Sequence, residues 1–236
     1  GVSLRFIVAS DGHYGQVGTE FDLFHENFIK NVTAFHASNP LDFCVINGDI
    51  IHDNKDFLLP AKTHFDKLPV SYFVTKGNHD MVSDAYWKEV WGMGVTHEVK
   101  VGGNTILLAT TSNEKGEYLS PDLNWLKDRL EANSKVKNVF MFIHIPQSKW
   151  TKHAIETPGF AELIKQQNNL RAVFHGHEHD QDGIKMIDSL PFMFDSHIGG
   201  SWGTSYKGFR VVELTKNNSI LTYIMNPAEK INQASF

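Results

Sequence analysis

Residues 4–13 read LRFIVASDGH, a nearly unbroken apolar run that ends in a short polar motif. An apolar run of this length predicts a strand that is buried on both of its faces. The polar end carries Asp11 and His13, and residues two positions apart point to the same side of an extended chain. We therefore expect a core strand whose carboxyl end presents two side chains of the metal-binding type.

The same arrangement recurs at four further places in the chain. Apolar runs at 43–46, 70–75, 138–143 and 170–174 also end in polar motifs. The first run is followed by Asp49 and the second by Asn78, His79 and Asp80. The third is followed by His144 and the fourth by His177 and His179. Ligand sites in open α/β folds collect at the carboxyl ends of strands. Five endings of this kind predict that these polar side chains converge on one site.

The rest of the sequence alternates between helical and extended patterns. Helices are expected over 20–37, 57–68, 85–91, 121–132 and 158–167. Further strands are expected at 96–101 and 105–109, joined by a Gly-Gly-Asn turn, and at 183–187, 191–195, 209–214 and 219–223. This order predicts an α/β fold in which two sheets pack together with helices outside, and we expect residues 1–236 to form one domain.

Composition excludes several classes of protein. The formal net charge of -5, with no block of lysines or arginines, argues against long nucleic acid as a partner. The single cysteine, Cys44, rules out an intramolecular disulfide and a thiolate zinc site, and no apolar stretch approaches the roughly 20 residues of a membrane span. The lone cysteine fits a soluble cytoplasmic protein. Since the chain begins at Gly1, it is also compatible with a periplasmic or secreted protein whose N-terminal signal was removed.

The types of side chain at the strand ends indicate a metal centre. The chain has 13 histidines, and histidine is the most common metal ligand in proteins. Aspartate, asparagine and neutral histidine together suit divalent Mn, Fe, Zn or Co. Seven candidates suit two ions about 3.5–4 Å apart that share a carboxylate, rather than one open catalytic ion. The seven are Asp11, His13, Asp49, Asn78, His144, His177 and His179.

Taken in order, these motifs resemble those of the calcineurin-like metallophosphoesterase superfamily. They are Asp-x-His, Gly-Asp, Gly-Asn-His-Asp, a lone His and Gly-His-x-His, and they span residues 11–179. The closest resemblance is to class III cyclic-nucleotide phosphodiesterases. It implies a four-layer α-β-β-α sandwich, in which two mixed β-sheets are flanked by helices.

The resemblance also implies roles for individual residues. One metal ion would be held by Asp11, His13 and His179, the other by Asn78, His144 and His177, and Asp49 would bridge them. His79 would be the catalytic histidine, and Asp80 would orient it. In one departure, this chain has His52, with Asp53 next, where many relatives carry an acidic residue three positions after the Gly-Asp aspartate.

The implied activity is hydrolysis of a phosphoric ester on a small phosphorylated substrate, and we expect a phosphodiesterase. A hydroxide bridging the metals would attack phosphorus in line with the leaving oxygen, and His79 would assist the leaving group. A phosphomonoesterase or a nucleotide-diphosphate hydrolase would use the same metal centre. Tyr14, beside His13, is expected to face the pocket, and His175 either contacts phosphate or merely ends its strand.

Two other classes are weaker alternatives. A non-catalytic scaffold on the same fold would be expected to have lost a ligand or His79, and none is missing. A metallo-β-lactamase-like hydrolase requires the order His-x-His-x-Asp-His, whereas here Asp180 follows the third histidine of its motif. The sequence leaves the oligomeric state open.

Overall fold

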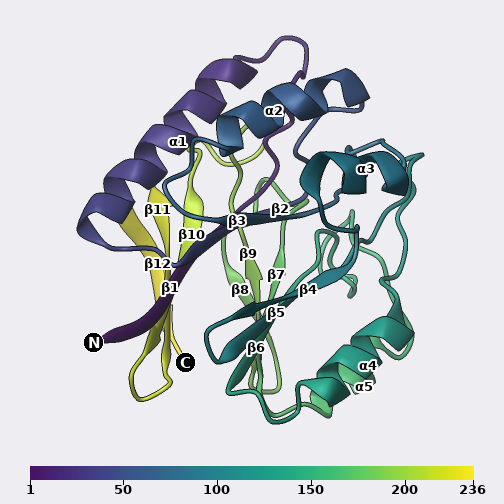
Figure 1. Ribbon diagram of the computed structural model, residues 1–236, viewed down its shortest axis with the longest axis vertical. Helices are drawn as coiled ribbons and strands as arrows, with labels where there is room; N and C mark the ends of the chain where they lie inside the picture. Colours follow the sequence, from purple (N-terminus) through teal and green to yellow (C-terminus); the bar gives the residue numbers. More distant parts are fainter.

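The computed structural model describes residues 1–236 and contains two six-stranded mixed sheets (Figure 1). In the first sheet, three parallel strands lie at one side: β1 (Val2–Ala9), β2 (Phe43–Asn47) and β3 (Tyr72–Thr75). An antiparallel ribbon continues the sheet from β1 and consists of β10 (Phe209–Thr215), β11 (Ile220–Asn226) and β12 (Glu229–Ser235). The strand order is therefore β12-β11-β10-β1-β2-β3.

The second sheet has the order β4-β5-β6-β7-β9-β8. Its centre consists of four parallel strands: β5 (Asn104–Leu108), β6 (Asn138–Phe142), β7 (Leu170–His175) and β9 (Leu190–Phe194). At its edges, β4 (His97–Val101) and β8 (Ile184–Ile187) pair antiparallel with their neighbours. Since parallel strands point the same way, the loops after β1, β2 and β3 leave one edge of the first sheet, and those after β6 and β7 leave one edge of the second.

Helices cover the outer face of each sheet (Figure 1). An apolar cluster of 23 buried residues joins the first sheet to α1 (Phe21–Ser38), α2 (Leu58–Phe65) and α3 (Asp84–Trp91). A cluster of 12 buried residues joins the second sheet to α4 (Leu123–Ala132) and α5 (Phe160–Lys165). A third cluster, of 15 residues, fills the space between the sheets. The predicted four-layer sandwich with two mixed sheets is therefore confirmed.

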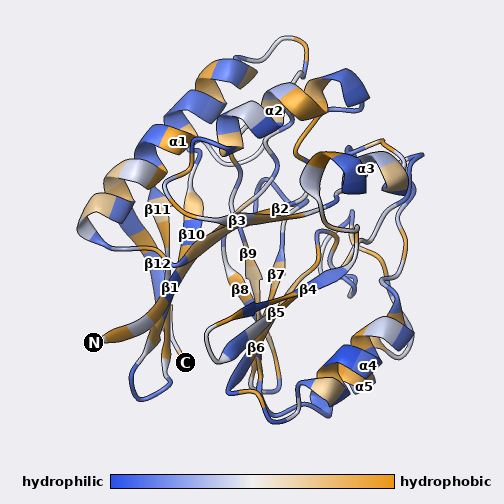
Figure 2. Ribbon diagram, in the orientation of Figure 1, coloured by the Kyte–Doolittle hydropathy of each residue, from blue (hydrophilic) through white to orange (hydrophobic).

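Strand β1 illustrates why its sequence is apolar at almost every position. Leu4, Phe6 and Val8 belong to the cluster between the sheets, whereas Ile7 and Ala9 belong to the cluster under the helices. Successive side chains of a strand point to opposite faces, so a strand between two layers needs apolar residues on both. Figure 2 shows the result as largely hydrophobic inner strands beneath helices that are striped with polar and apolar residues.

Most predicted elements are confirmed to within a few residues, with two differences. The helix predicted over 57–68 is a short 3-10 turn, Lys55–Phe57, followed by α2. Strand β12 was not predicted, because its sequence EKINQAS is polar and its side chains are exposed or half-buried. This strand forms by backbone pairing with β11 at the edge of the sheet. Such pairing does not require buried side chains, so the sequence shows no apolar pattern from which the strand could be predicted. No helix in the structure is long and apolar enough to cross a lipid bilayer.

Candidate metal centre

Side chains from both sheets meet at the carboxyl ends of the strands. Asp11 and His13 follow β1, Asp49 follows β2, His144 follows β6, and His177 and His179 follow β7. They form two groups whose ligand atoms lie within 4.8 Å of one another: Asp11, His13 and His179, and then Asp49, His144 and His177. The structure therefore brings together six of the seven candidate ligands in two groups. The first group is one of the sets that the resemblance implied, and the second contains His144 and His177 of the other set, with Asp49 in the place of Asn78.

The two groups adjoin each other. Nε2 of His179 lies 3.3 Å from Oδ1 of Asp11, and Nε2 of His144 lies 3.1 Å from Oδ2 of Asp49. Nε2 of His144 is also 3.7 Å from Oδ1 of Asp11, which links one group to the other. Within the first group, Nε2 of His13 and Nε2 of His179 are 2.9 Å apart. Lone pairs that point into one small space are what a shared cation requires.

Hydrogen bonding in the site supports the fit to metal ions. Oδ1 of Asp11, Oδ1 of Asn78 and Nε2 of His144 are buried without any hydrogen-bond partner. A buried polar atom left unpaired costs about 1–3 kcal/mol, and coordination to a cation would remove that cost. By contrast, Oδ2 of Asp11 accepts from the backbone N–H of His177, and Oδ1 of Asp49 accepts from that of His79. One oxygen of each carboxylate is thus fixed by the protein, while the other faces the site.

The imidazoles are held through the ring nitrogen that faces away from the site. Nδ1 of His144 lies 2.7 Å from the carbonyl oxygen of Asn47, and Nε2 of His177 lies 3.0 Å from that of His153. Nδ1 of His179 lies 3.2 Å from the carbonyl oxygen of Trp202. Such outer contacts set the tautomer and the orientation of a metal-binding histidine. These three rings are therefore oriented to present one lone pair each.

The backbone is strained where it presents these side chains. Asp11, His13, Asp49 and His177 have φ angles of +58°, +47°, +52° and +74°. Left-handed backbone is uncommon for residues other than glycine and costs of order 1–3 kcal/mol, and such residues gather at functional sites. The strand ends therefore turn sharply, so that neighbouring loops aim their ligands at the same point.

The charges of the site favour a cation. Burial acts to raise the pKa of Asp11, but the His144 and His179 rings outweigh it and hold that pKa well below its usual value. Burial acts to lower the pKa of His144, yet Asp49 and Asp11 together raise it to about 10. The two ionised carboxylates therefore stabilise positive charge at the position where the lone pairs converge.

The family model for calcineurin-like phosphoesterases matches residues 4–181 of the sequence. This chain is a calcineurin-like phosphoesterase. The expectation of a metal-dependent phosphoester hydrolase is thereby confirmed, and the His/Asp groups of the site could hold the two divalent ions that the family uses. The phosphoesterase is 28% identical to a protein named serine/threonine-protein phosphatase CPPED1 from Danio rerio, with 80% of this chain and 72% of that protein covered.

Solved structures show the same fold. A dimetal phosphatase from Danio rerio superposes with a TM-score of 0.75 and 13% identity, covering 100% of this chain and 99% of the other. Purple acid phosphatase PPD1 from yellow lupin, Lupinus luteus, superposes with a TM-score of 0.73 and 11% identity. That match covers 98% of this chain and 53% of the lupin protein.

The carboxylate against the His79 ring belongs to Asp53, which corrects the expectation for Asp80. Nδ1 of His79 lies 2.8 Å from Oδ1 of Asp53. Asp80 is fully buried, and its two oxygens accept hydrogen bonds from the backbone N–H groups of Ile51, at 2.9 Å, and Gly77, at 2.7 Å. Asp80 therefore holds two loops together and does not reach the ring. The sequence did carry a sign of this role, because Asp53 stands one position after the place, now His52, where the Gly-Asp motif of many relatives has its acidic residue.

Two residues that were expected at the pocket of the phosphoesterase lie elsewhere. The Tyr14 hydroxyl donates to Asp22, and its ring packs edge-on against Phe21 in the cluster under the helices. His175 is fully buried, with Nδ1 3.1 Å from the carbonyl oxygen of Ile143 and its ring parallel to that of Phe192. The Tyr14 ring belongs to the cluster under the helices, and His175, two residues after Val173 on β7, shares the outward side of that strand. The Tyr14 prediction is corrected, and of the two readings of His175, the structure favours a strand-ending core residue.

Two aromatic side chains that belong to no motif lie beside the ligands. The Trp202 ring stacks on the His179 ring with 4.0 Å between centroids, and the Tyr118 ring meets the His177 ring edge-on at 5.0 Å. Trp202 and Tyr118 are 46% and 40% exposed, so they border the open side of the site. Both residues lie outside the motifs, and only the folded chain brings them beside the ligands.

Proposed function

We propose that this phosphoesterase hydrolyses phosphomonoesters on small phosphorylated molecules, and that residues 1–236 act as one catalytic domain. The observation that carries the proposal is the pair of adjoining ligand groups, in which Oδ1 of Asp11 and Nε2 of His144 are buried without a hydrogen-bond partner. The proposed ligands of two ions are Asp11, His13, Asp49, Asn78, His144, His177 and His179. The phosphatase names of the relative and of the neighbouring structures support a monoester substrate.

The chemistry divides between bound ions and the side chains around them. Two divalent ions of Mn, Fe, Zn or Co, held by two ionised carboxylates, would leave a net charge of about +2 to neutralise a phosphoryl dianion and would activate water as the nucleophile. Burial lowers the pKa of His79, but Asp49 and Asp53 outweigh burial and raise that pKa above its usual value. Protonated His79, held at Nδ1 by Asp53, would give its Nε2 proton to the departing ester oxygen.

A phosphodiester remains the second candidate, on a separate observation. All four arginines have partners away from the ligand groups: Arg5 pairs with Glu213, Arg129 with Asp128, Arg171 with Asn138, and Arg210 with the carbonyl oxygen of Phe194. No guanidinium therefore remains to bind two oxygens of a phosphate dianion in the bidentate manner typical of arginine. A diester carries one negative charge fewer and needs such a partner less.

A substrate panel tests the proposal. The purified protein is assayed with each of Mn, Fe, Zn and Co on p-nitrophenyl phosphate, on bis(p-nitrophenyl) phosphate and on a nucleoside diphosphate, with Asp49→Ala as the inactive control. We expect the highest kcat/KM on p-nitrophenyl phosphate. A preference for bis(p-nitrophenyl) phosphate would replace the monoester proposal by the diester, and activity retained in Asp49→Ala would contradict the proposed metal centre itself.

A further inference from the structure

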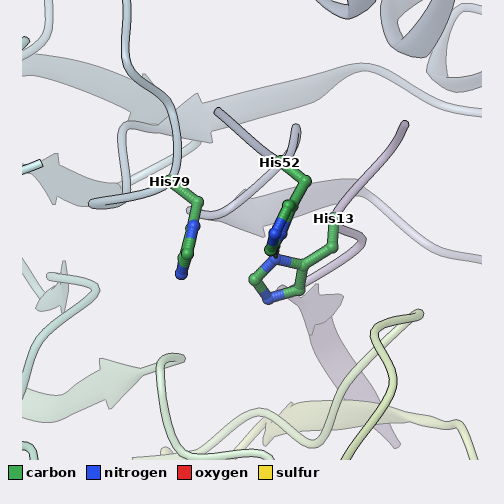
Figure 3. A group of neighbouring side chains, drawn as sticks. All are labelled: His13, His52 and His79. Carbon is green, nitrogen blue, oxygen red and sulfur yellow. Dashed lines mark hydrogen bonds between the residues drawn. The ribbon is translucent and has the colours of Figure 1, made fainter. Parts of the chain in front are cut away.

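His52 contacts both a candidate metal ligand and the candidate proton donor. Its Nδ1 lies 3.0 Å from Nδ1 of His13, and its ring stacks on that of His79 with 4.7 Å between centroids and 13° between planes. Figure 3 shows the parallel rings of His52 and His79, with the tip of His52 directed at the His13 ring. The three imidazoles come from three separate loops, after β1, β2 and β3.

The backbone fixes His52 in this place. The N–H of His52 donates to the carbonyl oxygen of Tyr14, directly after His13, at 3.0 Å. The N–H of Asp53 donates to the carbonyl oxygen of His79 at 2.9 Å. The loop that carries His52 is therefore hydrogen-bonded to both neighbouring loops. This anchoring holds the backbone of His52 between His13 and His79, so that its ring lies within reach of both.

The hydrogen bond to His13 requires a particular tautomer on each ring. Nε2 of His13 faces Oδ1 of Asp11 at 3.7 Å and Nε2 of His179 at 2.9 Å, so this nitrogen supplies the lone pair of the proposed ligand. The ring proton of neutral His13 then lies on Nδ1 and is donated to Nδ1 of His52. His52 in turn carries its proton on Nε2, which lies 3.9 Å from Oδ2 of Asp53.

We propose that His52 is a positioning residue with two separable tasks. Its Nδ1 accepts the His13 proton and thereby orients that ring for metal binding. Its flat face supports the His79 ring and thereby keeps Nε2 of His79 directed at the leaving oxygen. The second task rests on the hydrolase function proposed above, whereas the first concerns metal binding alone and can be measured without any substrate.

Two substitutions separate the tasks. His52→Asn keeps an acceptor, because the side-chain oxygen of asparagine can take about the position of Nδ1, but it removes the flat ring. His52→Phe keeps a ring to stack on His79 and removes the acceptor. The matched control is Lys55→Gln, an exposed position in the same loop region. Mn²⁺ affinity is measured from the electron paramagnetic resonance signal of free Mn²⁺, and kcat is measured at saturating Mn²⁺.

The expected results are opposite for the two variants. His52→Phe should weaken Mn²⁺ binding by about 10- to 100-fold, as for other lost partners of metal-binding histidines, and should keep kcat within about threefold of the parent. His52→Asn should keep Mn²⁺ affinity within about threefold and should lose about 10- to 100-fold in kcat, because the His79 ring is free to tilt. Lys55→Gln should change neither quantity.

Other outcomes would overturn the proposal. If both variants lose affinity and kcat to the same extent, His52 has a general packing role, and if neither variant differs from Lys55→Gln, it has no role at all. If the parent turns over no phosphate ester, the proposed phosphomonoester hydrolysis fails. The Mn²⁺ measurement would even then decide whether His52 supports His13.

Discussion

Three aspartates close to the site have separate tasks, which their hydrogen-bond partners reveal. Asp49 directs one oxygen at His144, Asp53 lies against the His79 ring, and Asp80 binds only backbone N–H groups. The same type of side chain thus serves as a proposed metal ligand in Asp49, as the partner of the proposed proton donor in Asp53, and as a structural link between two loops in Asp80. What differs is the backbone position from which each carboxylate is presented.

Substitution by asparagine should separate the tasks of Asp53 and Asp80. Asp53→Asn removes the charge that supports protonated His79, so we expect kcat to fall by at least about tenfold with little change in the free energy of unfolding. Asp80→Asn can accept at only one oxygen and leaves a buried N–H unpaired, which should cost about 1–3 kcal/mol of stability. Steady-state kinetics and urea unfolding measure the two effects, and the reverse pattern would contradict both assignments.

His25 should make the fold sensitive to acid. Burial lowers the pKa of His25 to about 4, below its ordinary 6.5, even though its Nδ1 lies 2.7 Å from the carbonyl oxygen of Phe21. As the pH falls from 6.5 to about 4, His25 binds a proton in the unfolded chain but not in the folded chain, so the free energy of unfolding decreases. The loss should reach about 3 kcal/mol and then level off.

Urea unfolding at several pH values checks the contribution of His25. His25→Asn keeps a donor near Nδ1 but has no proton to bind, so its stability should depend less on pH between 6.5 and 4. A slope identical to that of the parent would show that this ring does not carry the effect.

At the scale of elements, the strand ends do more than terminate the sheets. Gly48 follows β2 with φ of +91°, and a Cβ at this position would lie only 2.4 Å from Nδ1 of His144. Strand β2 and the loop after β6 therefore approach so closely that only glycine fits between them. This contact is one place where the first sheet and the second sheet fix each other's ligands.

Gly48→Ala should consequently impair both stability and metal binding. A matched control is Gly18→Ala, because Gly18 has a similar φ of +82° but no atom within 4 Å of an added Cβ. The control should lose only the cost of left-handed backbone, about 1–2 kcal/mol. Gly48→Ala should lose more than that and should also weaken Mn²⁺ binding, since the His144 ring must move. If Gly48→Ala and Gly18→Ala had equal effects on the free energy of unfolding and on Mn²⁺ affinity, the close approach of Gly48 to His144 would be unimportant.

At the scale of the molecule, the candidate metal centre joins the two sheets. Asp11 and Asp49 come from the first sheet, and His144, His177 and His179 come from the second. Between the sheets lies a cluster rich in phenylalanine, in which Phe6 of β1 stacks on Phe43 and meets Phe140, Phe142 and Phe174 edge-on. Apolar packing and metal coordination thus act across the same boundary.

Divalent ions should therefore stabilise the whole fold. An ion that binds only the folded chain contributes about 2.7 kcal/mol for each site when its concentration is 100 times its Kd. Added Mn²⁺ should raise the unfolding midpoint in urea, and a chelator should lower it. Asp49→Ala is the control, and an undiminished effect of Mn²⁺ in that variant would place the stabilising ions elsewhere.

The linear sequence determined the layered fold, most of its elements and the set of candidate ligands. Buried strands are apolar at nearly every position, and parallel strands deliver their end motifs to a common edge, so local patterns were sufficient for these features. Only the tertiary structure decided the partners of those residues: Asp53 and not Asp80 against His79, His52 between His13 and His79, Tyr14 turned to the helices, and strand β12 at the sheet edge. These depend on loop trajectories and on contacts between distant segments, which leave no periodic pattern in the chain.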